Sequence, residues 1–168
     1  MLDRLRRAVR AFRQRDPWPD AAPWRRDILA RVAPYTMASA EQTLATIAAT
    51  EYLERSRIEG DFVECGVWRG GQVMAAMLTL QDLGGARDFH LFDTFERMTT
   101  PGHADVDLDG KPASAIHGRL TARPAGERWC EAGEEQVRAN IAALGYPLDR
   151  VHFAKGDVLR TIPALAPA

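Results

Sequence analysis

The chain has 168 residues, of which 46% are hydrophobic and 27% are charged, so it is long enough for one hydrophobic core and short for two. Its 22 basic and 23 acidic residues leave a net charge of -1, which gives no electrostatic reason to expect a nucleic-acid partner. No apolar run approaches the roughly 20 residues of a membrane-spanning helix. We therefore expect a protein that acts on a small molecule without a membrane.

The first fifteen residues contain six arginines and one acid, with apolar residues at helical spacing between them. This pattern predicts an amphipathic helix with a cationic face that packs on the domain or on a second subunit, which leaves a homo-oligomer open. The prolines within residues 16–23 predict that a loop follows this helix. The segment lacks the apolar core of a secretory signal, and the two cysteines do not form a disulfide scaffold, so a cytoplasmic location is expected.

Apolar runs alternate with helical patterns over the rest of the chain. Ser39 followed by Gln42 is a capping-box pattern that predicts a helix to about Arg57. A long polar connection, residues 97–133, predicts a lid or a binding loop. Strands are predicted at residues 61–66, 89–93 and 151–154, and helices at residues 73–83 and 134–144. This order predicts an α/β fold in which a helical region, residues 1–58, precedes a parallel sheet with crossover helices, residues 59–168.

Glycines and acids gather where the predicted strands end. The turn after the first strand reads ECGVWRGG over residues 64–71, and its glycines let the backbone and a helix amino terminus approach a ligand. Asp93 ends the second strand, where it can accept hydrogen bonds from both hydroxyls of an unphosphorylated ribose, and Asp157 follows the third, where it can accept one from an adenine amino group. Each acid alone is more often a helix cap or a solvated loop residue. Together with Glu64, which closes the first strand, they predict a nucleotide site.

Several segments together resemble the macrocin O-methyltransferase family, which methylates hydroxyls on the deoxysugars of macrolides and related glycosylated natural products. The resemblance spans about residues 33–165 and implies the Rossmann-like fold of a class I methyltransferase, of which this chain carries the amino-terminal half. The matching segments are YTMAS (35–39), GDFVECGVWRGG (60–71), LFDTFE (91–96), GYP (145–147) and KGD (155–157).

The resemblance implies S-adenosylmethionine as the cofactor and a small glycosylated molecule as the substrate. Glu64, Gly66 and Gly70 would surround the methionine part of the cofactor, Asp93 would hold its ribose and Asp157 its adenine. The full set of cofactor-binding residues implied in this way is Thr36, Met37, Glu64, Gly66, Trp68, Gly70, Gly71, Asp93, Thr94 and Asp157.

The amino-terminal segment and the long connection receive roles from the same resemblance. Thr36 and Met37 match a pair that covers the cofactor near its reactive methyl group, with simple core packing as the alternative for Met37. Tyr35 would line the acceptor pocket. Residues 97–133 would form a mobile lid over the substrate, although Arg97 stands where many relatives have glycine.

Family members look Mg²⁺-dependent, with carboxylates from a fourth strand and a later Asp-Asp pair, and neither element is present in this chain. We expect the fourth strand to begin within residues 161–168. The catalytic residues and the Mg²⁺ ligands are therefore expected in a missing carboxyl-terminal half, and this chain is expected to be an inactive or nearly inactive fragment without a metal site of its own. The first strand would then be an exposed edge of the sheet.

Two other functions are left open. The first is a Rossmann-type sugar-modifying enzyme of another class, such as an NAD-dependent one, although the Gly-x-x-x-Gly spacing and Glu64 argue against it. The second is a truncated, non-catalytic module that associates through its arginine-rich segment and its sheet edge. A run at residues 105–110 resembles an EF-hand loop, but Ile116 occupies the position where calcium requires an acid, and the four histidines lack metal-ligand spacing.

Overall fold

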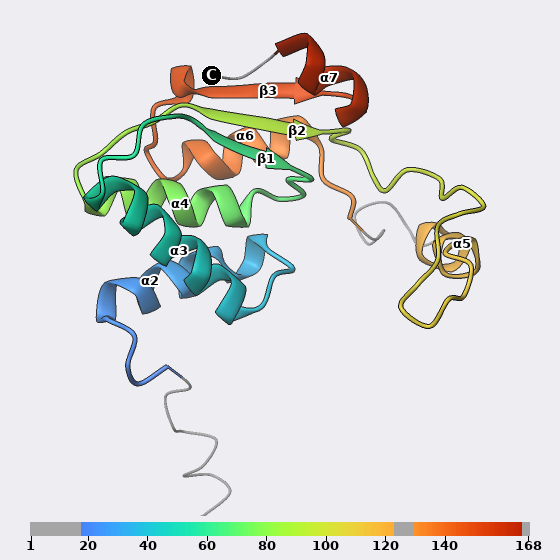
Figure 1. The fold of residues 1–168 in the computed structure, drawn as a ribbon, viewed down its shortest axis with the longest axis horizontal. Helices are drawn as coiled ribbons and strands as arrows, with labels where there is room; N and C mark the ends of the chain where they lie inside the picture. Colours follow the sequence, from blue (N-terminus) through green and yellow to red (C-terminus); the bar gives the residue numbers. More distant parts are fainter. Residues whose placement is uncertain (1–17, 123–129, 166–168) are drawn as a thin grey trace, which may run out of the picture.

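The structure, a computed structural model, describes residues 18–122 and 130–165 (Figure 1). The predicted arginine-rich helix lies outside the described residues, as do residues 123–129 of the predicted lid. Three parallel strands, β1 (Phe62–Cys65), β2 (Phe89–Asp93) and β3 (Val151–Lys155), form one sheet in the order β1-β2-β3. The predicted Rossmann-like arrangement of three parallel strands with crossover helices is confirmed.

The helices lie on both sides of this sheet. In Figure 1, α4 and α6 lie on one side with α2 and α3 beyond α4, and α7 lies on the other side of β3. None of the described helices is long and apolar enough to cross a bilayer. The helical elements are α2 (Pro23–Val32), η1 (Ala33–Tyr35), α3 (Ala40–Arg55), α4 (Gly71–Asp82), α5 (Ser114–Thr121), α6 (Glu134–Ala142), η2 (Leu148–Arg150) and α7 (Val158–Leu165).

The core is centred on α4, which packs against the sheet on one side and against α2 and α3 on the other. A helix covered on two sides needs apolar residues around most of its circumference, and nine of the 12 residues of α4 are buried. The helices before the sheet share this core, because Ile28, Val32 and Ile47 are buried in it with Phe89 and Leu91 of β2. The division of the chain at residue 58 stays a prediction.

Two helices lie where the sequence predicted irregular structure. Pro23, expected within a loop, is instead the first residue of α2. The fixed φ of proline suits a helix, and its lack of an N–H costs no hydrogen bond there because the first residues of a helix have no intrahelical acceptor. Helix α5 lies within the segment predicted to be one long irregular connection. Its signal is weak because no side chain caps its start and Gly118 interrupts it. It lies on the side of the molecule to which the strands point (Figure 1).

The fourth strand expected to begin within residues 161–168 does not begin within residues 161–165, which belong to helix α7, and residues 166–168 lie outside the described residues. Asp157 starts this helix: its Oδ1 accepts the N–H of Leu159 at 2.9 Å, and its carbonyl oxygen accepts the N–H of Thr161 at 3.0 Å. The sequence misled because Pro163 lies inside the helix. Leu159 and Leu165 are 81% and 55% exposed, so α7 carries apolar side chains that the described residues leave uncovered.

Strand β1 pairs only with β2 among the described residues and is an edge of the sheet, as expected. Val63 is 49% exposed and Cys65 is also exposed, while the alternate residues Phe62 and Glu64 are less accessible. The face of β1 directed away from α4 is therefore open to solvent.

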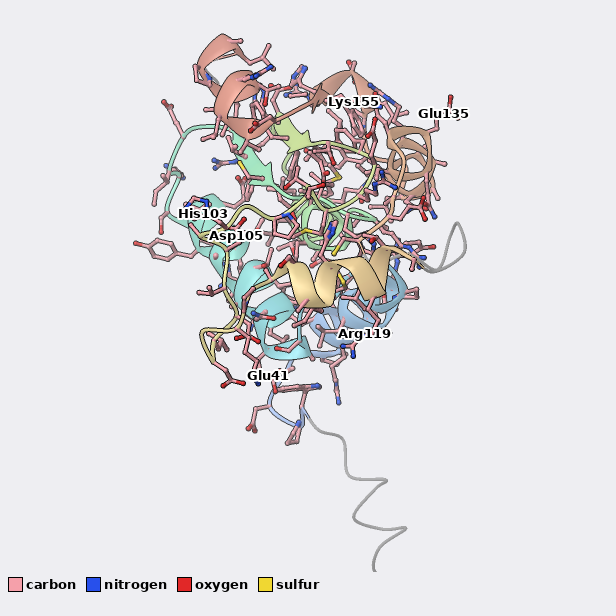
Figure 2. All side chains as sticks on the ribbon, turned by 90° about the vertical axis from the view of Figure 1, so that its right-hand side faces the viewer. Glu41, His103, Asp105, Arg119, Glu135 and Lys155 are labelled. Atoms are coloured by element: carbon pink, nitrogen blue, oxygen red, sulfur yellow. The ribbon has the colours of Figure 1, made fainter. Side chains whose placement is uncertain are left out.

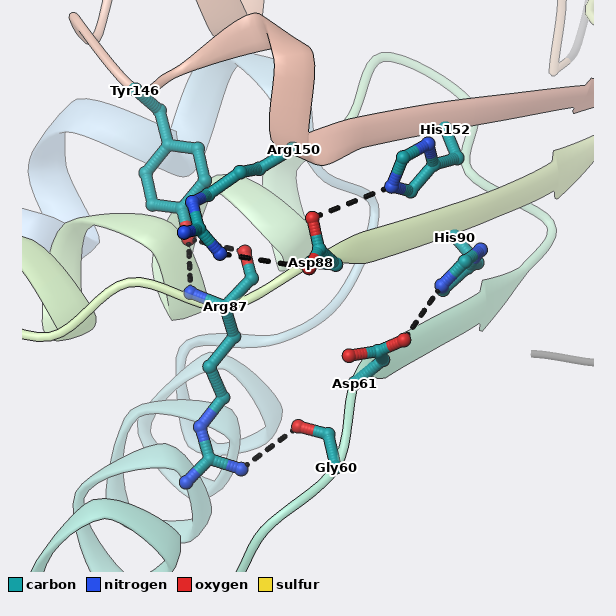
Figure 3. Close-up of polar contacts among 8 residues, drawn as sticks. All are labelled: Gly60, Asp61, Arg87, Asp88, His90, Tyr146, Arg150 and His152. Atoms are coloured by element: carbon teal, nitrogen blue, oxygen red, sulfur yellow. Dashed lines mark hydrogen bonds and ion pairs between the residues drawn. The ribbon is translucent and has the colours of Figure 1, made fainter. Parts of the chain in front are cut away.

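The amino-terminal ends of the strands are held by a polar cluster (Figure 3). The Tyr146 hydroxyl donates to the Arg87 carbonyl at 2.7 Å and accepts the Arg87 N–H at 2.9 Å. The Arg87 guanidinium donates to the carbonyl of Gly60 at 3.0 Å. Two acid and histidine pairs complete the cluster, Asp61 with His90 and Asp88 with His152. This cluster fixes one end of the sheet and leaves the opposite, carboxyl end for a binding site.

Candidate functional site

Two cavities adjoin at the carboxyl end of the sheet and share Met37, Gly66 and Trp68 in their walls. The larger, of about 380 Å³, lies beside the ends of β2 and β3, and the smaller, of about 200 Å³, lies between β1 and the segment before α3. The larger cavity is also lined by Phe92, Asp93, Thr94, Arg97, Met98, Thr99, Cys130, Gly156, Asp157 and Val158. The smaller is also lined by Tyr35, Thr36, Ala38, Glu64, Val67, Gly71 and Gln72. Every predicted site residue except Gly70 lines one of the two.

Asp93 organises the turn that follows β1. Its Oδ2 accepts the backbone N–H of Val67 at 2.6 Å and of Trp68 at 3.1 Å, and its Oδ1 accepts the N–H of Phe95 at 3.0 Å. Trp68 has a φ of 48°, a left-handed conformation that a non-glycine residue adopts at a cost, and the Asp93 carboxylate holds it there. Asp93 therefore shapes the wall of the cavity as well as lining it.

The two glycines at the start of α4 have different roles. Gly71 lies against the chain before α3: a Cβ at this position would be 2.6 Å from the Tyr35 carbonyl oxygen and from the Thr36 Cβ. Gly70 has a φ of 90° and lies against α6, where a Cβ would be 3.3 Å from a methyl group of Val137. Gly70 lines neither cavity, so its place in the turn follows from backbone conformation and packing.

Replacing Gly71 with alanine should force the Tyr35 and Thr36 backbone away from α4. We expect Gly71→Ala to lower the free energy of unfolding by roughly 1–3 kcal/mol, the usual cost of overpacking, in a urea titration. The matched control is Gly118→Ala in α5, where a Cβ would meet no atom within 4 Å and alanine favours the helix. A Gly71→Ala chain as stable as the wild type would contradict the close contact.

Glu64 is the acid of the smaller cavity, and its environment disfavours a negative charge. Burial raises the pKa of its carboxyl to about 8, the N–H of Val73 acts in the opposite direction, and the Asp93 carboxylate raises it further. At neutral pH this carboxyl therefore keeps its proton in the unliganded chain. A ligand cation placed beside it would favour the ionised form.

Asp157 and Cys130 also line the larger cavity. Asp157 is exposed, and its carboxylate caps the start of α7. It is therefore a helix cap and a residue of the cavity wall at the same time. Burial and then the Asp93 charge raise the pKa of the Cys130 thiol, which keeps it protonated and unreactive.

The long segment after β2 lies in front of the carboxyl ends of the strands. Figure 2 looks onto that side: α5, with Arg119, crosses the front, His103 and Asp105 precede it, and Lys155 lies above at the end of β3. Arg97 and Met98, at the start of this segment, line the larger cavity. This position is the one that a lid over a bound ligand requires, and the lid itself stays a prediction.

Sequence reasoning missed several residues of the walls. Met98, Thr99 and Cys130 carried no signal, because they lie in or after the irregular connection and reach the cavity only through the fold. Gln72 carried one: it is a polar residue in the first turn of α4, and an apolar run, residues 73–78, follows it.

The described residues do not fit a metal ion, since among them no group of three or more His, Cys, Asp or Glu side chains could hold one. In the acidic run of residues 105–110, Asp107 closes a turn: its Oδ1 accepts the N–H groups of Asp109 and of Lys111, both at 2.9 Å. The described part of the chain therefore offers no Mg²⁺ site.

The three parallel strands with their crossover helices, together with the glycine turn after β1, define a Rossmann-like fold of the class I methyltransferase type. The solved structure of the O-methyltransferase NovP has this fold: it matches with a TM-score of 0.64 and 24% sequence identity over 79% of this chain and 52% of the NovP chain. The sequence profile of the macrocin O-methyltransferase (TylF) family matches residues 19–168, and the chain belongs to this family.

A curated relative comes from Streptomyces olivaceus, the 8-demethyl-8-(2,3-dimethoxy-alpha-L-rhamnosyl)-tetracenomycin-C 4'-O-methyltransferase. It is 34% identical to this chain over 107 residues, which are 63% of this chain and 38% of the relative. The chain thus spans about half the length of NovP and less of this relative.

Proposed function

We propose that this chain is the cofactor-binding part of an S-adenosylmethionine-dependent O-methyltransferase that methylates a sugar hydroxyl of a glycosylated natural product. The observation that carries the proposal is the two-lobed cavity at the carboxyl end of the sheet, with one acid in the smaller lobe and two in the larger. Membership of the macrocin O-methyltransferase family supports it, as does the name of the Streptomyces olivaceus relative, a 4'-O-methyltransferase of a rhamnosyl-tetracenomycin.

The chemistry of the two lobes suits the two halves of the cofactor. Asp93 and Asp157 offer carboxylate oxygens for the ribose hydroxyls and the adenine amino group in the larger lobe. Glu64 offers a carboxyl for the ammonium group of the methionine part in the smaller lobe. Met37 and Trp68, which line both lobes, would lie at their junction. When bound, S-adenosylmethionine supplies a methyl group on a positively charged sulfur.

The role of this chain is to bind and orient the cofactor and to exclude water from it. A sugar hydroxyl is a poor nucleophile at neutral pH and needs a base. We place the catalytic residues, together with any Mg²⁺ ligands, in the part of the relatives that this chain does not cover. Tyr35, in the wall of the smaller lobe, is proposed to contact the acceptor. A cytoplasmic location and a homo-oligomer stay predictions.

Isothermal titration calorimetry with S-adenosylhomocysteine, the product form of the cofactor, tests the proposal. We expect one ligand bound per chain, no heat from NAD at the same concentration, and quenching of tryptophan fluorescence from Trp68 in the shared wall. Binding of NAD without binding of S-adenosylhomocysteine would replace the proposal with a nucleotide-dependent enzyme of another class. No binding of either would leave a chain that only associates with others.

A further inference from the structure

We propose that Gln72 is a positioning residue of the cofactor site, whose side-chain amide holds residues 35–38 over the smaller lobe. This inference rests on the proposed function and adds to it a residue outside the matching family segments. It depends on the hydrogen bonds of one amide, on the identity of its partners, and on where the segment lies.

The Gln72 amide joins three threonines from two elements. Its Nε2 donates to the Thr36 hydroxyl oxygen at 3.1 Å and to the Thr43 hydroxyl oxygen at 2.9 Å. Its Oε1 accepts from the Thr46 hydroxyl at 2.7 Å, and the single hydrogen of this hydroxyl is also within reach of the Gln42 carbonyl oxygen, at the longer distance of 3.2 Å. Both amide hydrogens and one oxygen lone pair are therefore used, and Gln72 links the start of α4 to α3 and to the segment that precedes α3.

The orientation of the amide follows from its partners. Thr43 gives its own hydrogen to the Ser39 carbonyl at 3.1 Å, so it must accept from Gln72. An amide turned by 180° would place its oxygen against this acceptor and lose the bond. These partners need a side chain that donates two hydrogen bonds and accepts one, as glutamine does. Thr43 is 1% exposed, so water cannot replace the bond that its hydroxyl oxygen accepts from Gln72.

The segment held in this way forms one wall of the smaller lobe. Tyr35, Thr36 and Met37 line it together with Glu64 and Gln72. Thr36 also accepts the N–H of Ala38 at 3.0 Å, so its hydroxyl oxygen joins the bend of the segment to Gln72. Beyond the bend, the capping box of Ser39 fixes the start of α3. Met37 is 55% exposed, so its own packing does not fix the segment.

Loss of the Gln72 amide should therefore affect one lobe more than the other. S-adenosylhomocysteine fills both lobes, whereas adenosine lacks the methionine part and fills only the larger one. A general loss of packing would weaken the binding of both ligands together. A misplaced wall in the smaller lobe would weaken only the binding of S-adenosylhomocysteine.

The test is calorimetry of both ligands with the whole chain and Gln72→Met, which keeps the length of the side chain and its fit to an apolar helix but removes all three hydrogen bonds. We expect roughly tenfold weaker binding of S-adenosylhomocysteine and unchanged binding of adenosine. The matched control is Gln81→Met on the exposed surface near the other end of α4, which should bind both ligands as the wild type does.

A milder variant covers the case in which Gln72→Met does not fold. Thr46→Val removes the hydroxyl that contacts the amide oxygen, together with its bond to the Gln42 carbonyl within α3, and leaves both bonds of Nε2 in place. It should give the same selective loss at smaller size. Equal loss of both ligands, or no loss of either, in the folded variants would overturn the role of Gln72 while leaving the proposed function in place. A wild-type chain that does not bind S-adenosylhomocysteine would instead overturn the proposed function.

Discussion

Asp93→Asn should both destabilise the chain and abolish most of its affinity for S-adenosylhomocysteine. Two backbone N–H groups meet Oδ2 of this carboxylate, and the Phe95 N–H meets Oδ1. An asparagine has one acceptor oxygen, so its NH₂ group must face at least one of these donors and leave it without a partner. Each orphaned donor costs about 1–3 kcal/mol, and the free energy of unfolding should fall by at least that much in a urea titration.

The loss of affinity has a second cause in the shape of the turn. If the one remaining acceptor oxygen faces Phe95, the N–H groups of Val67 and Trp68 lose their acceptor, and the left-handed conformation of Trp68, whose side chain lines both lobes, is weakened. The matched control is Asp88→Asn near the other end of β2, where an exposed carboxylate pairs with Arg150 and His152. This change should cost little stability and leave binding intact. Comparable losses in the two variants would show that Asp93 has no special place in the site.

The second large effect is on the pH dependence of stability, and it comes from Glu64. The pKa of its carboxyl is about 8 in the folded chain, against 4.5 for an unperturbed glutamate. Between these two values the folded chain keeps a proton that the unfolded chain has released. The stability that this group contributes is therefore fully present below pH 4.5 and is lost as the pH rises to 8, by at most about 1.4 kcal/mol per pH unit.

Glu64→Gln removes this titration while it keeps the shape of the side chain. Urea titrations from pH 5 to 8 should show that the wild type loses stability relative to Glu64→Gln as the pH rises. Subtracting the free energy of unfolding of the variant from that of the wild type at each pH removes the contribution of the other titrating groups, which both chains share. If the stabilities of the two chains instead changed in parallel with pH, the Glu64 carboxyl would be exposed to water and not buried.

A bound ammonium group should ionise the Glu64 carboxyl. The wild type, and not the variant, should therefore release a proton when it binds S-adenosylhomocysteine, which calorimetry detects as a binding heat that depends on the buffer.

The sequence predicted best the features that short spacings determine. The strand at residues 89–93 has the predicted bounds, because its apolar residues lie between a pair of glycines and an acid, and the capping box of Ser39 and Gln42 starts α3 as predicted. Because parallel strands end at one edge of a sheet, the acids that follow them come together without further information. The edge of the sheet at which the two cavities lie was therefore predictable from topology alone.

What the sequence could not predict depends on contacts between distant residues. Asp93 accepts hydrogen bonds from Val67 and Trp68, which precede it by 26 and 25 positions in the sequence. Gly71 packs against Tyr35, which lies in a separate segment of the chain. Helix α7 occupies residues 161–165, where a strand was expected to begin, and the Asp157 side chain caps its start. Gly70 shows the converse: it belongs to the matching motif, yet its position is explained by the turn and by α6.

The open edge of β1 also governs how the purified chain will behave. Its backbone N–H and C=O groups on that edge are a template for another strand, and the exposed Val63 beside them adds an apolar surface. Concentrated samples should therefore form soluble aggregates through strand pairing, and the exposed Cys65 on the same strand would cross-link them in air. Ligand affinities are therefore best measured on dilute, freshly reduced protein.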